Sequence, residues 1–113
     1  MKIKRIEHVA VAVKKLEPTM ALLEDLFGFK LEYKEDRETA RLAMYPFGET
    51  YVELVEGKSG MPAQWFAENG EGLFHLCFEV DDIDAALVYY NLCKLSGFEC
   101  ERVTVGLTPA NGA

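Results

Sequence analysis

Two histidines and one glutamate combine the residue types and the spacing that suggest chemistry in this chain. His8 and His75 are its only histidines, and each stands third in an eight-residue stretch that ends in valine, Ile6–Val13 and Leu73–Val80. Glu53 lies among apolar neighbours, where a carboxylate is costly unless a positive charge pairs with it. Imidazole and carboxylate groups together suit a divalent metal ion. We therefore predict that His8, Glu53 and His75 bind one such ion, with Co²⁺, Ni²⁺, Zn²⁺ and Mn²⁺ all compatible.

The two histidine stretches are copies of one sequence unit. Each is followed by an amphipathic helical pattern that ends in Gly-Phe, at Gly28 and Gly97. The distances from histidine to glycine are 28 − 8 = 20 and 97 − 75 = 22 residues. A repeated unit determines the architecture of a chain, so both histidines should occupy equivalent places in two related modules.

Alternation with a period of two predicts that both histidines lie on β-strands. In the first copy His8 shares its face with Ala10 and Ala12, and valines occupy the opposite face. In the second copy His75 shares its face with Cys77, while leucine, phenylalanine and valine lie opposite. We expect helices to cover the bulky faces and the histidine faces to line a cavity.

The remaining pattern predicts short elements around these strands. The spacing of glycine, proline and apolar residues divides the chain into module one at 1–57, a connector at 58–72 and module two at 73–113, all within one domain. The expected strands cover 3–13, 29–36, 39–46, 49–56, 73–80 and 98–105, and the expected helices cover 16–27, 63–68 and the segment from Asp81 or Asp82 to Gly97.

Composition narrows the function classes. The chain has 113 residues, of which 50% are hydrophobic and 27% charged, and a net charge of −7, so it reads as one globular domain. Its basic residues are scattered, which argues against nucleic acid and membrane surfaces as partners. The sequence predicts no membrane span and no signal peptide, and we expect a cytoplasmic location. Three cysteines without zinc-ribbon spacing indicate reduced, structural thiols.

The repeat also predicts where a second carboxylate would stand. Glu53 follows Gly28 by 25 residues, so its counterpart falls near 97 + 25 = 122, whereas the sequence ends at Ala113. We expect module two to be incomplete at this end, with a fourth ligand supplied by later residues or by another chain. A sheet that lacks its last strands leaves an open edge, which predicts a homodimer.

The stretch Gly70–Ile83 is the most specific motif of the chain. It reads G-E-G-L-F-H-L-C-F-E-V-D-D-I and is similar to the G-E-G-L-H-H-x-x-F-E-V-D-D-I of methylmalonyl-CoA epimerases. Ile6–Val13 and the strand that holds Val52-Glu53-Leu54 add to the likeness. By these residues the chain resembles the vicinal oxygen chelate superfamily, and within it the methylmalonyl-CoA epimerases ahead of glyoxalase I.

This resemblance implies an α+β fold of paired βαβββ modules that bind a metal ion through His8, Glu53 and His75. It also implies a reaction in which the metal stabilises the enolate of an acyl thioester while two acids exchange a proton at the α-carbon. Where the epimerases place one of these acids, near the third strand, the chain has Leu42 and its neighbours, with Glu38 as the nearby carboxylate. We therefore expect Glu38 as the catalytic base, although a hydrated turn would explain it equally well.

Two aromatic residues are candidates for substrate binding. Tyr51 shares a face with Glu53, and Trp65 lies in the connector, where a hydrophobic anchor is the main alternative. The substrate would be a small molecule, either an acyl-CoA or, for a glyoxalase I-like lyase, a glutathione adduct. A metal-free binding protein of the same fold, similar to the bleomycin-resistance proteins, is the third function that these residues allow.

Overall fold

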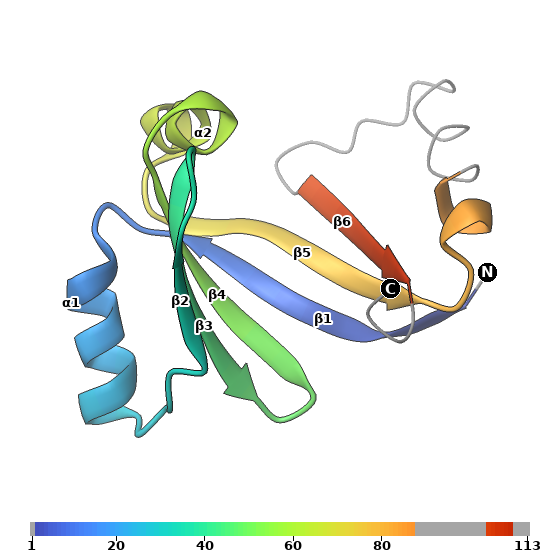
Figure 1. Ribbon diagram of the computed structural model, residues 1–113, viewed down its shortest axis with the longest axis horizontal. Coiled ribbons are helices and arrows are strands. Elements are labelled where there is room, and N and C mark those ends of the chain that lie inside the picture. The colour runs from blue at the N-terminus through green and yellow to red at the C-terminus, as the bar shows by residue number, and fades with distance from the viewer. Residues whose placement is uncertain (1, 88–103, 110–113) are drawn as a thin grey trace.

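The computed structural model describes residues 2–87 and 104–109, which form an α+β fold around one six-stranded sheet (Figure 1). The strands lie in the order β2-β3-β4-β1-β5-β6. The elements are β1 (Ile3–Ala12), α1 (Leu16–Ala21), the π-helical turn η1 (Leu22–Leu26), β2 (Tyr33–Asp36), β3 (Ala40–Phe47), β4 (Thr50–Gly57), α2 (Gly60–Asn69), β5 (Gly72–Val80) and β6 (Thr104–Pro109). The predicted fold class is confirmed.

β1 joins the two halves of the sheet. It pairs in parallel with β4 and antiparallel with β5, while β5 pairs in parallel with β6. In the antiparallel ladder His8 lies opposite Cys77, and Ala10 lies opposite His75. In the sequence repeat His75 corresponds to His8, and Cys77 corresponds to Ala10. The two pairs are therefore equivalent, with the strands interchanged. The paired strands therefore have the two-fold relationship that the repeat predicts.

Each of these strands carries one extra residue directly before its histidine. The ladder between β1 and β5 skips Glu7, which lies between the paired residues Ile6 and His8, and it skips Phe74, which precedes His75 on β5. Such β-bulges locally twist a strand and re-aim its side chains, and they are common beside active sites. A strict period of two does not predict them.

The bulky face of β1 packs beneath the first helix, as expected. Val13, directly after β1, joins Leu16, Tyr45 and two other buried residues in one hydrophobic cluster. Val11 of β1 packs against this cluster, as do Met20 and Leu23 of the helical segment. Burial of such apolar side chains contributes roughly 25 cal/mol per Å² removed from water. The predicted cover of the bulky face is thus confirmed.

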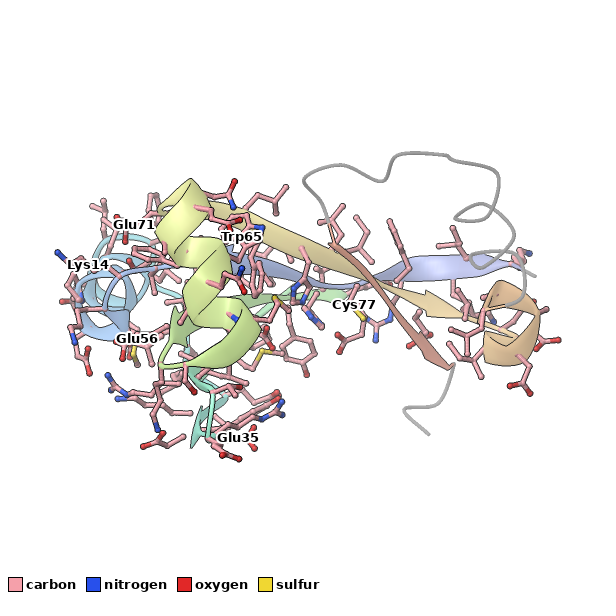
Figure 2. The ribbon with its side chains drawn as sticks, turned by 90° about the horizontal axis from the view of Figure 1, so that it is seen from above. Lys14, Glu35, Glu56, Trp65, Glu71 and Cys77 are labelled. Atoms are coloured by element: carbon pink, nitrogen blue, oxygen red, sulfur yellow. The ribbon has the colours of Figure 1, made fainter. Side chains whose placement is uncertain are left out.

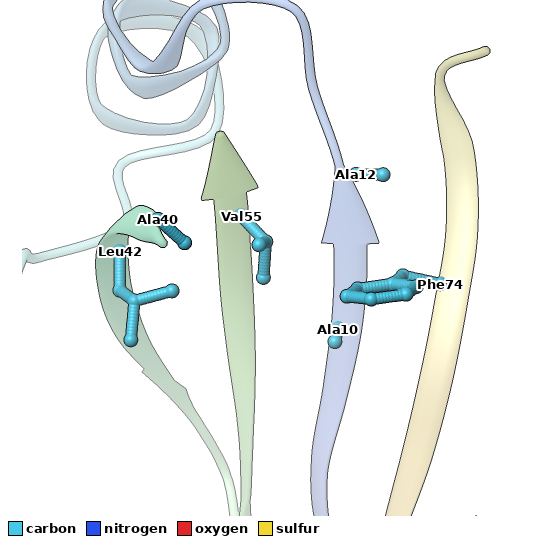
Figure 3. Close-up of a cluster of buried hydrophobic side chains, with 6 residues drawn as sticks. All are labelled: Ala10, Ala12, Ala40, Leu42, Val55 and Phe74. Atoms are coloured by element: carbon cyan, nitrogen blue, oxygen red, sulfur yellow. The ribbon is translucent and has the colours of Figure 1, made fainter. Parts of the chain in front are cut away.

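The other face of β1 is lined by small residues. A second cluster joins Ala10 and Ala12 of β1 to four residues of neighbouring strands, namely Ala40, Leu42, Val55 and Phe74 (Figure 3). The methyl groups of Ala10 and Ala12 leave room above the sheet, while Phe74 closes one side of it. This face also carries His8, so the cluster forms one wall of the region in which the histidines lie.

The connector contains a longer helix than the sequence predicts. We expected 63–68, whereas α2 has 10 residues, Gly60–Asn69. It ends at Gly70, whose φ of 75° suits glycine. Trp65 and Phe66 pack against the small-residue cluster, so α2 covers one end of the histidine face. The periodicity missed its first turn because Gly60 and Pro62 read as breakers.

The first helix and the second strand are shorter than predicted. The α-helical pattern expected over 16–27 ends at Ala21, where η1 continues with wider turns. Leu16, Met20 and Leu23 of the predicted apolar stripe pack in the core, whereas Phe27 is 60% exposed. The strand expected from residue 29 begins at Tyr33. None of the helices seen in residues 2–87 has the length and apolar character that a membrane crossing requires.

The second module is described only in part. Asp82 begins the predicted helix, because its carboxylate accepts the Ala85 N–H at 3.0 Å, and residues 83–87 are helical. Residues 88–103, which include Cys93, Cys100 and most of the strand expected at 98–105, lie outside the described part of the chain. β6 begins at Thr104 and holds, beside β5, the place that β4 holds beside β1.

A buried ion pair ties the start of α1 to the sheet. Glu56 of β4 is 7% exposed and accepts hydrogen bonds from the Leu16 N–H at 3.0 Å and from Arg41 at 3.1 Å to each carboxylate oxygen. Arg41 also contacts Glu17 at 2.5 Å. The hydrogen bonds satisfy the buried carboxylate and fix the end of the loop that follows β1.

Candidate metal centre

The structure brings the three predicted ligands together. His8 of β1, Glu53 of β4 and His75 of β5 place one ligand atom each within 4.8 Å of one another. The Nε2 atoms of His8 and His75 are 3.1 Å apart. The two rings meet edge to face, with centroids 5.2 Å apart. Two nitrogens bound to one ion at about 2.0–2.1 Å each can lie this close, so the histidine geometry fits a shared metal.

Ala10 explains why these side chains converge. It pairs with Glu53 on β4 and with His75 on β5, so the three residues form one row across the sheet. His8 lies two residues earlier on the same face of β1. Because Ala10 is fully buried and ends in a methyl group, no bulky side chain separates the glutamate from the histidine.

The site opens into a cavity of about 290 Å³. Its lining combines the three predicted ligands with one cation, one threonine hydroxyl and several apolar groups: His8, Arg37, Thr39, Ala40, Leu42, Glu53, Val55, Met61, Pro62, Phe74 and His75. This volume is near the lower end of small-molecule sites. The expectation that the histidine faces line a cavity is confirmed.

Burial shifts the protonation equilibria of two candidate ligands. It raises the pKa of Glu53, against the attraction of His8 and Arg37. Burial and the neighbouring His8 lower the pKa of His75. His75 therefore tends to stay neutral, with a nitrogen lone pair free, while Glu53 lacks a full counter-charge. A divalent cation would meet both conditions, because it needs the neutral imidazole and stabilises the carboxylate.

These observations test whether a metal fits the residues present. The donor set of two imidazoles and one carboxylate matches Zn²⁺, Co²⁺, Ni²⁺ and Mn²⁺. The residues that would hold the ion are His8, Glu53 and His75. The position on β6 that corresponds to Glu53 on β4 is Gly106, which pairs with Cys77.

Three other predicted site residues, Glu38, Tyr51 and Trp65, are not part of the cavity lining. Glu38 is exposed in the turn between β2 and β3, and its neighbours Arg37 and Thr39 line the cavity, whereas Glu38 does not. Tyr51 is also outside the lining, and its hydroxyl donates to Glu32 at 3.2 Å. The catalytic role of Glu38 and the substrate contact of Tyr51 stay predictions.

Trp65 contacts a residue of the cavity lining but does not itself line the cavity. It belongs to α2 (Figure 2). Its ring packs on Phe74 of β5 with centroids 4.9 Å apart. Phe74 in turn lines the cavity. This placement favours the hydrophobic anchor that the sequence left open, while direct contact of Trp65 with a substrate stays a prediction.

The structure adds residues that sequence reasoning did not select. Arg37 lines the cavity although the charged run around it reads as a hydrated turn. Glu7 contacts the Nδ1 of His8, and Glu7, His8 and Cys77 form a second group with ligand atoms within 4.8 Å of one another. The pairing of Cys77 with His8 follows from the repeat, but the bulge that re-aims Glu7 has no sequence signal.

Cys77 behaves as a structural thiol in the described part of the chain. It is buried and forms no disulfide. Burial and the nearby Glu7 and Glu53 carboxylates raise the pKa of the Cys77 thiol to about 11. The thiol therefore stays protonated near neutral pH, which makes it unreactive and agrees with the reduced state expected from the sequence.

Comparison with known protein families gives one match over most of the chain. The sequence model of the Glyoxalase/Bleomycin resistance protein/Dioxygenase superfamily matches residues 7–101. This range contains all three predicted metal ligands.

Individual relatives agree with that match. Methylmalonyl-CoA epimerase from human mitochondria is 28% identical over 107 residues, which are 90% of this chain and 60% of that protein, so the chain spans less than two thirds of it. The uncharacterized protein YaeR of Escherichia coli is 28% identical over 91% of this chain and 79% of its own length. A solved variant of Streptomyces coelicolor methylmalonyl-CoA epimerase, in complex with 2-nitronate-propionyl-CoA, is 25% identical with a TM-score of 0.80 over 98% of both chains.

Proposed function

Because the chain belongs to the Glyoxalase/Bleomycin resistance protein/Dioxygenase superfamily, we propose that it is a metal-dependent isomerase that acts through an enolate on an acyl thioester. Methylmalonyl-CoA is the substrate that we would test first, since relatives of known activity are methylmalonyl-CoA epimerases. The observation that carries the proposal is the convergence of His8, Glu53 and His75 within 4.8 Å at one cavity.

Different cavity residues would bind the metal, bind the substrate and exclude water. His8, Glu53 and His75 would hold a divalent ion, which would serve as a Lewis acid towards an enolate oxygen. Arg37 offers a positive charge to an anionic substrate group at the cavity wall. Leu42 and Phe74 exclude water from one side, which strengthens electrostatic interactions in the site.

Proton transfer is the step for which the cavity supplies fewest groups. Among the described residues that line the cavity, the one carboxylate is Glu53, which the metal would occupy. We propose Glu38 as the base, which requires the β2–β3 turn to bring its side chain inward between Arg37 and Thr39. A second acid would have to come from beyond the described residues or from a partner chain.

One observation favours a second candidate function. Leu42 is buried and lines the cavity near the point where the epimerases that this chain resembles place an acid. An apolar group there favours retention of a ligand over proton transfer. A metal-free binding protein, similar to the bleomycin-resistance members of the superfamily, would need the apolar wall and Arg37 but neither Glu38 nor a metal. A glyoxalase I-like lyase would share the metal and differ in its substrate.

Metal content separates these candidates. We would measure bound Co²⁺, Ni²⁺, Zn²⁺ and Mn²⁺ in the purified chain by elemental analysis, beside His8→Ala, His75→Ala and the control Glu68→Gln on the exposed side of α2. The proposal expects about one ion per chain, lost in both histidine variants and kept in the control. An absence of metal after incubation with each ion would overturn it in favour of the binding protein.

Substrate assays then separate the two enzymes. With metal bound, the α-proton of methylmalonyl-CoA should exchange with deuterium from D₂O, which NMR detects even if turnover is slow. If that proton does not exchange but the glutathione adduct of methylglyoxal is converted, the glyoxalase I-like alternative replaces the epimerase.

Assembly and location complete the proposal. We propose a homodimer, because β2 and β6 are the outer strands of the described sheet and natural proteins pair or cover such edges. Light scattering coupled to size-exclusion chromatography would contradict this proposal if it gave the mass of one chain. We also propose that the protein works in the cytoplasm, which cell fractionation would test.

A further inference from the structure

The two bulged residues that precede the histidines differ in chemistry. On β1 the bulge carries Glu7, and on β5 the equivalent place carries Phe74. Alternation would direct Glu7 away from the face of His8, since neighbouring residues on a regular strand point to opposite sides. The bulge cancels this alternation, and the Glu7 carboxylate contacts the Nδ1 of His8. A backbone irregularity thus places an acid beside one candidate metal ligand.

The contact fixes the protonation pattern of the His8 ring. An ionised carboxylate only accepts hydrogen bonds, so Nδ1 must carry the proton. In the neutral imidazole Nε2 then keeps its lone pair. That nitrogen is the one that lies 3.1 Å from His75. The ring therefore presents its unprotonated nitrogen to the place where the candidate ligand atoms converge.

The second histidine follows an aromatic residue instead of an acid. Phe74 packs its ring against His75, with centroids 4.9 Å apart and planes inclined by 53°. It also packs on Trp65. His75 therefore packs on an aromatic ring, whereas His8 contacts a carboxylate. Both strands have a bulge directly before the histidine, but the residue at the bulge is Glu7 on β1 and Phe74 on β5.

We propose that Glu7 is a positioning residue for His8: its carboxylate accepts the Nδ1 proton, orients the ring and makes Nε2 the metal-binding nitrogen. This inference rests on the proposed function, because it assigns a role at the same metal centre. Carboxylates that hold a ligating histidine in this way typically contribute 10–100-fold to metal affinity. The group formed by Glu7, His8 and Cys77 is then support for the first site and not a second metal site.

Metal affinity tests the assignment. We would titrate Co²⁺ into the metal-free full chain by isothermal titration calorimetry, for the wild type, Glu7→Ala, Glu7→Gln and the exposed control Glu68→Gln. The expected result is an affinity about 10–100-fold weaker in Glu7→Ala, a smaller loss in Glu7→Gln because its amide oxygen still accepts a hydrogen bond, and no change in Glu68→Gln. Equal affinities in all four proteins would overturn the proposal.

The absorption spectrum of the Co²⁺ protein gives an independent check. If Cys77 and Glu7 bind the metal themselves, a thiolate-to-Co²⁺ charge-transfer band should appear and should vanish in Cys77→Ser. Such a band would overturn the positioning role, since the ion would then lie at the group formed by Glu7, His8 and Cys77 instead of at His8, Glu53 and His75. The expected result is a spectrum without this band and unchanged by Cys77→Ser.

A measurement without metal separates this inference from the proposed function. Long-range ¹H–¹⁵N NMR of the metal-free protein reports which nitrogen of His8 carries the proton. We expect protonated Nδ1 in the wild type and in Glu68→Gln, and a shift towards protonated Nε2 in Glu7→Ala. If the wild type has this pattern but binds no Co²⁺, the metal function fails while the Glu7 contact stands. An identical His8 signal in Glu7→Ala would refute the role of Glu7.

Discussion

The Nε2 atoms of His8 and His75 lie 3.1 Å apart although 67 residues separate them in the chain. The antiparallel pairing of β1 with β5 brings the two strands together, and the parallel pairing of β1 with β4 adds Glu53 from the other side. Ala10 stands between Glu53 and His75 in this row. The candidate metal centre therefore depends on a small residue that contributes no ligand.

A larger side chain at position 10 should displace the metal ligands on both sides of it, Glu53 and His75. Ala10 is fully buried, so Ala10→Val forces its extra methyl groups toward Glu53 and His75. Overpacking of this kind typically costs about 1–3 kcal/mol of stability. We expect a lower Tm by differential scanning calorimetry and, in the chain that still folds, at least about tenfold weaker Co²⁺ binding by calorimetry. The same substitution at the exposed Ala67 of α2 is the control. Wild-type Co²⁺ affinity in Ala10→Val would refute the argument.

The sequence predicts the parts of this site that follow from regular periodicity. The repeat identifies His8 and His75 as equivalent, and alternation assigns the faces of β1, both of which agree with the sheet register and the two hydrophobic clusters. Glu53 was predicted because a carboxylate among apolar residues needs a partner. Each of these predictions needs only the sequence pattern of a single strand or the comparison of the two repeats.

Features that depend on several elements at once were not predicted. The bulge at Glu7 arises from the pairing of two strands, and a single-strand pattern cannot contain it. Arg37 reaches the cavity because the β2–β3 turn lies next to α2, which is a tertiary contact that local charge does not encode. The α-helical pattern ends at Ala21, where η1 begins, and Phe27 is 60% exposed where the spacing predicts burial.

Removing the charge of Glu53 should stabilise the metal-free protein. Burial raises the pKa of Glu53 above its ordinary value of 4.5, so the folded chain binds this proton more tightly than the unfolded chain. The contribution of Glu53 to stability is therefore greatest at low pH and is lost as the pH rises through the folded-state pKa. We expect Glu53→Gln to have a higher Tm than the wild type at pH 7, measured in EDTA, and the difference to vanish in acid.

Added metal should make the wild type more stable than Glu53→Gln, which is the reverse of the order expected in EDTA. With Co²⁺ present, the wild type gains stability from binding whereas Glu53→Gln loses a charged ligand. The exposed Glu68→Gln variant should follow the wild type in both conditions. A Glu53→Gln protein that is less stable than the wild type at pH 7 in EDTA would contradict the electrostatic argument.

The buried Glu56 should matter more for stability than for the metal. Glu56→Ala leaves the Leu16 N–H without its acceptor, and an unsatisfied buried donor typically costs about 1–3 kcal/mol. We expect a lower urea midpoint and unchanged Co²⁺ affinity in the folded protein. Glu17→Ala removes the exposed partner of Arg41 and should change the midpoint little. Equal effects of the two substitutions would indicate that Leu16 does not depend on Glu56.

Glu38 is the proposed base, so its charge should be needed for proton exchange. We expect Glu38→Gln to slow the exchange of the α-proton of methylmalonyl-CoA by about 10²–10⁴-fold, with metal content unchanged. Asp36→Asn, in the same charged run, is the control, because the Asp36 carboxylate already pairs with Lys58 at 2.7 Å. Full activity in Glu38→Gln would exclude Glu38 and require the base to come from elsewhere.

Arg37 should determine how tightly an anionic substrate binds. Arg37 lines the cavity, and its guanidinium pairs with Glu35 at 3.0 Å. Hydrogen bonding to that carboxylate raises the pKa of Arg37, so it stays charged. A charged hydrogen bond to a substrate typically contributes about 1.5–3 kcal/mol, so Arg37→Ala should raise KM by roughly 10–100-fold while kcat and metal content change little. Arg37→Lys should recover part of this loss, since lysine keeps the charge without the planar fork.

If Arg37→Ala lowers kcat at unchanged KM, Arg37 would instead act on the transition state. If neither constant changes, the anionic group must bind elsewhere in the cavity.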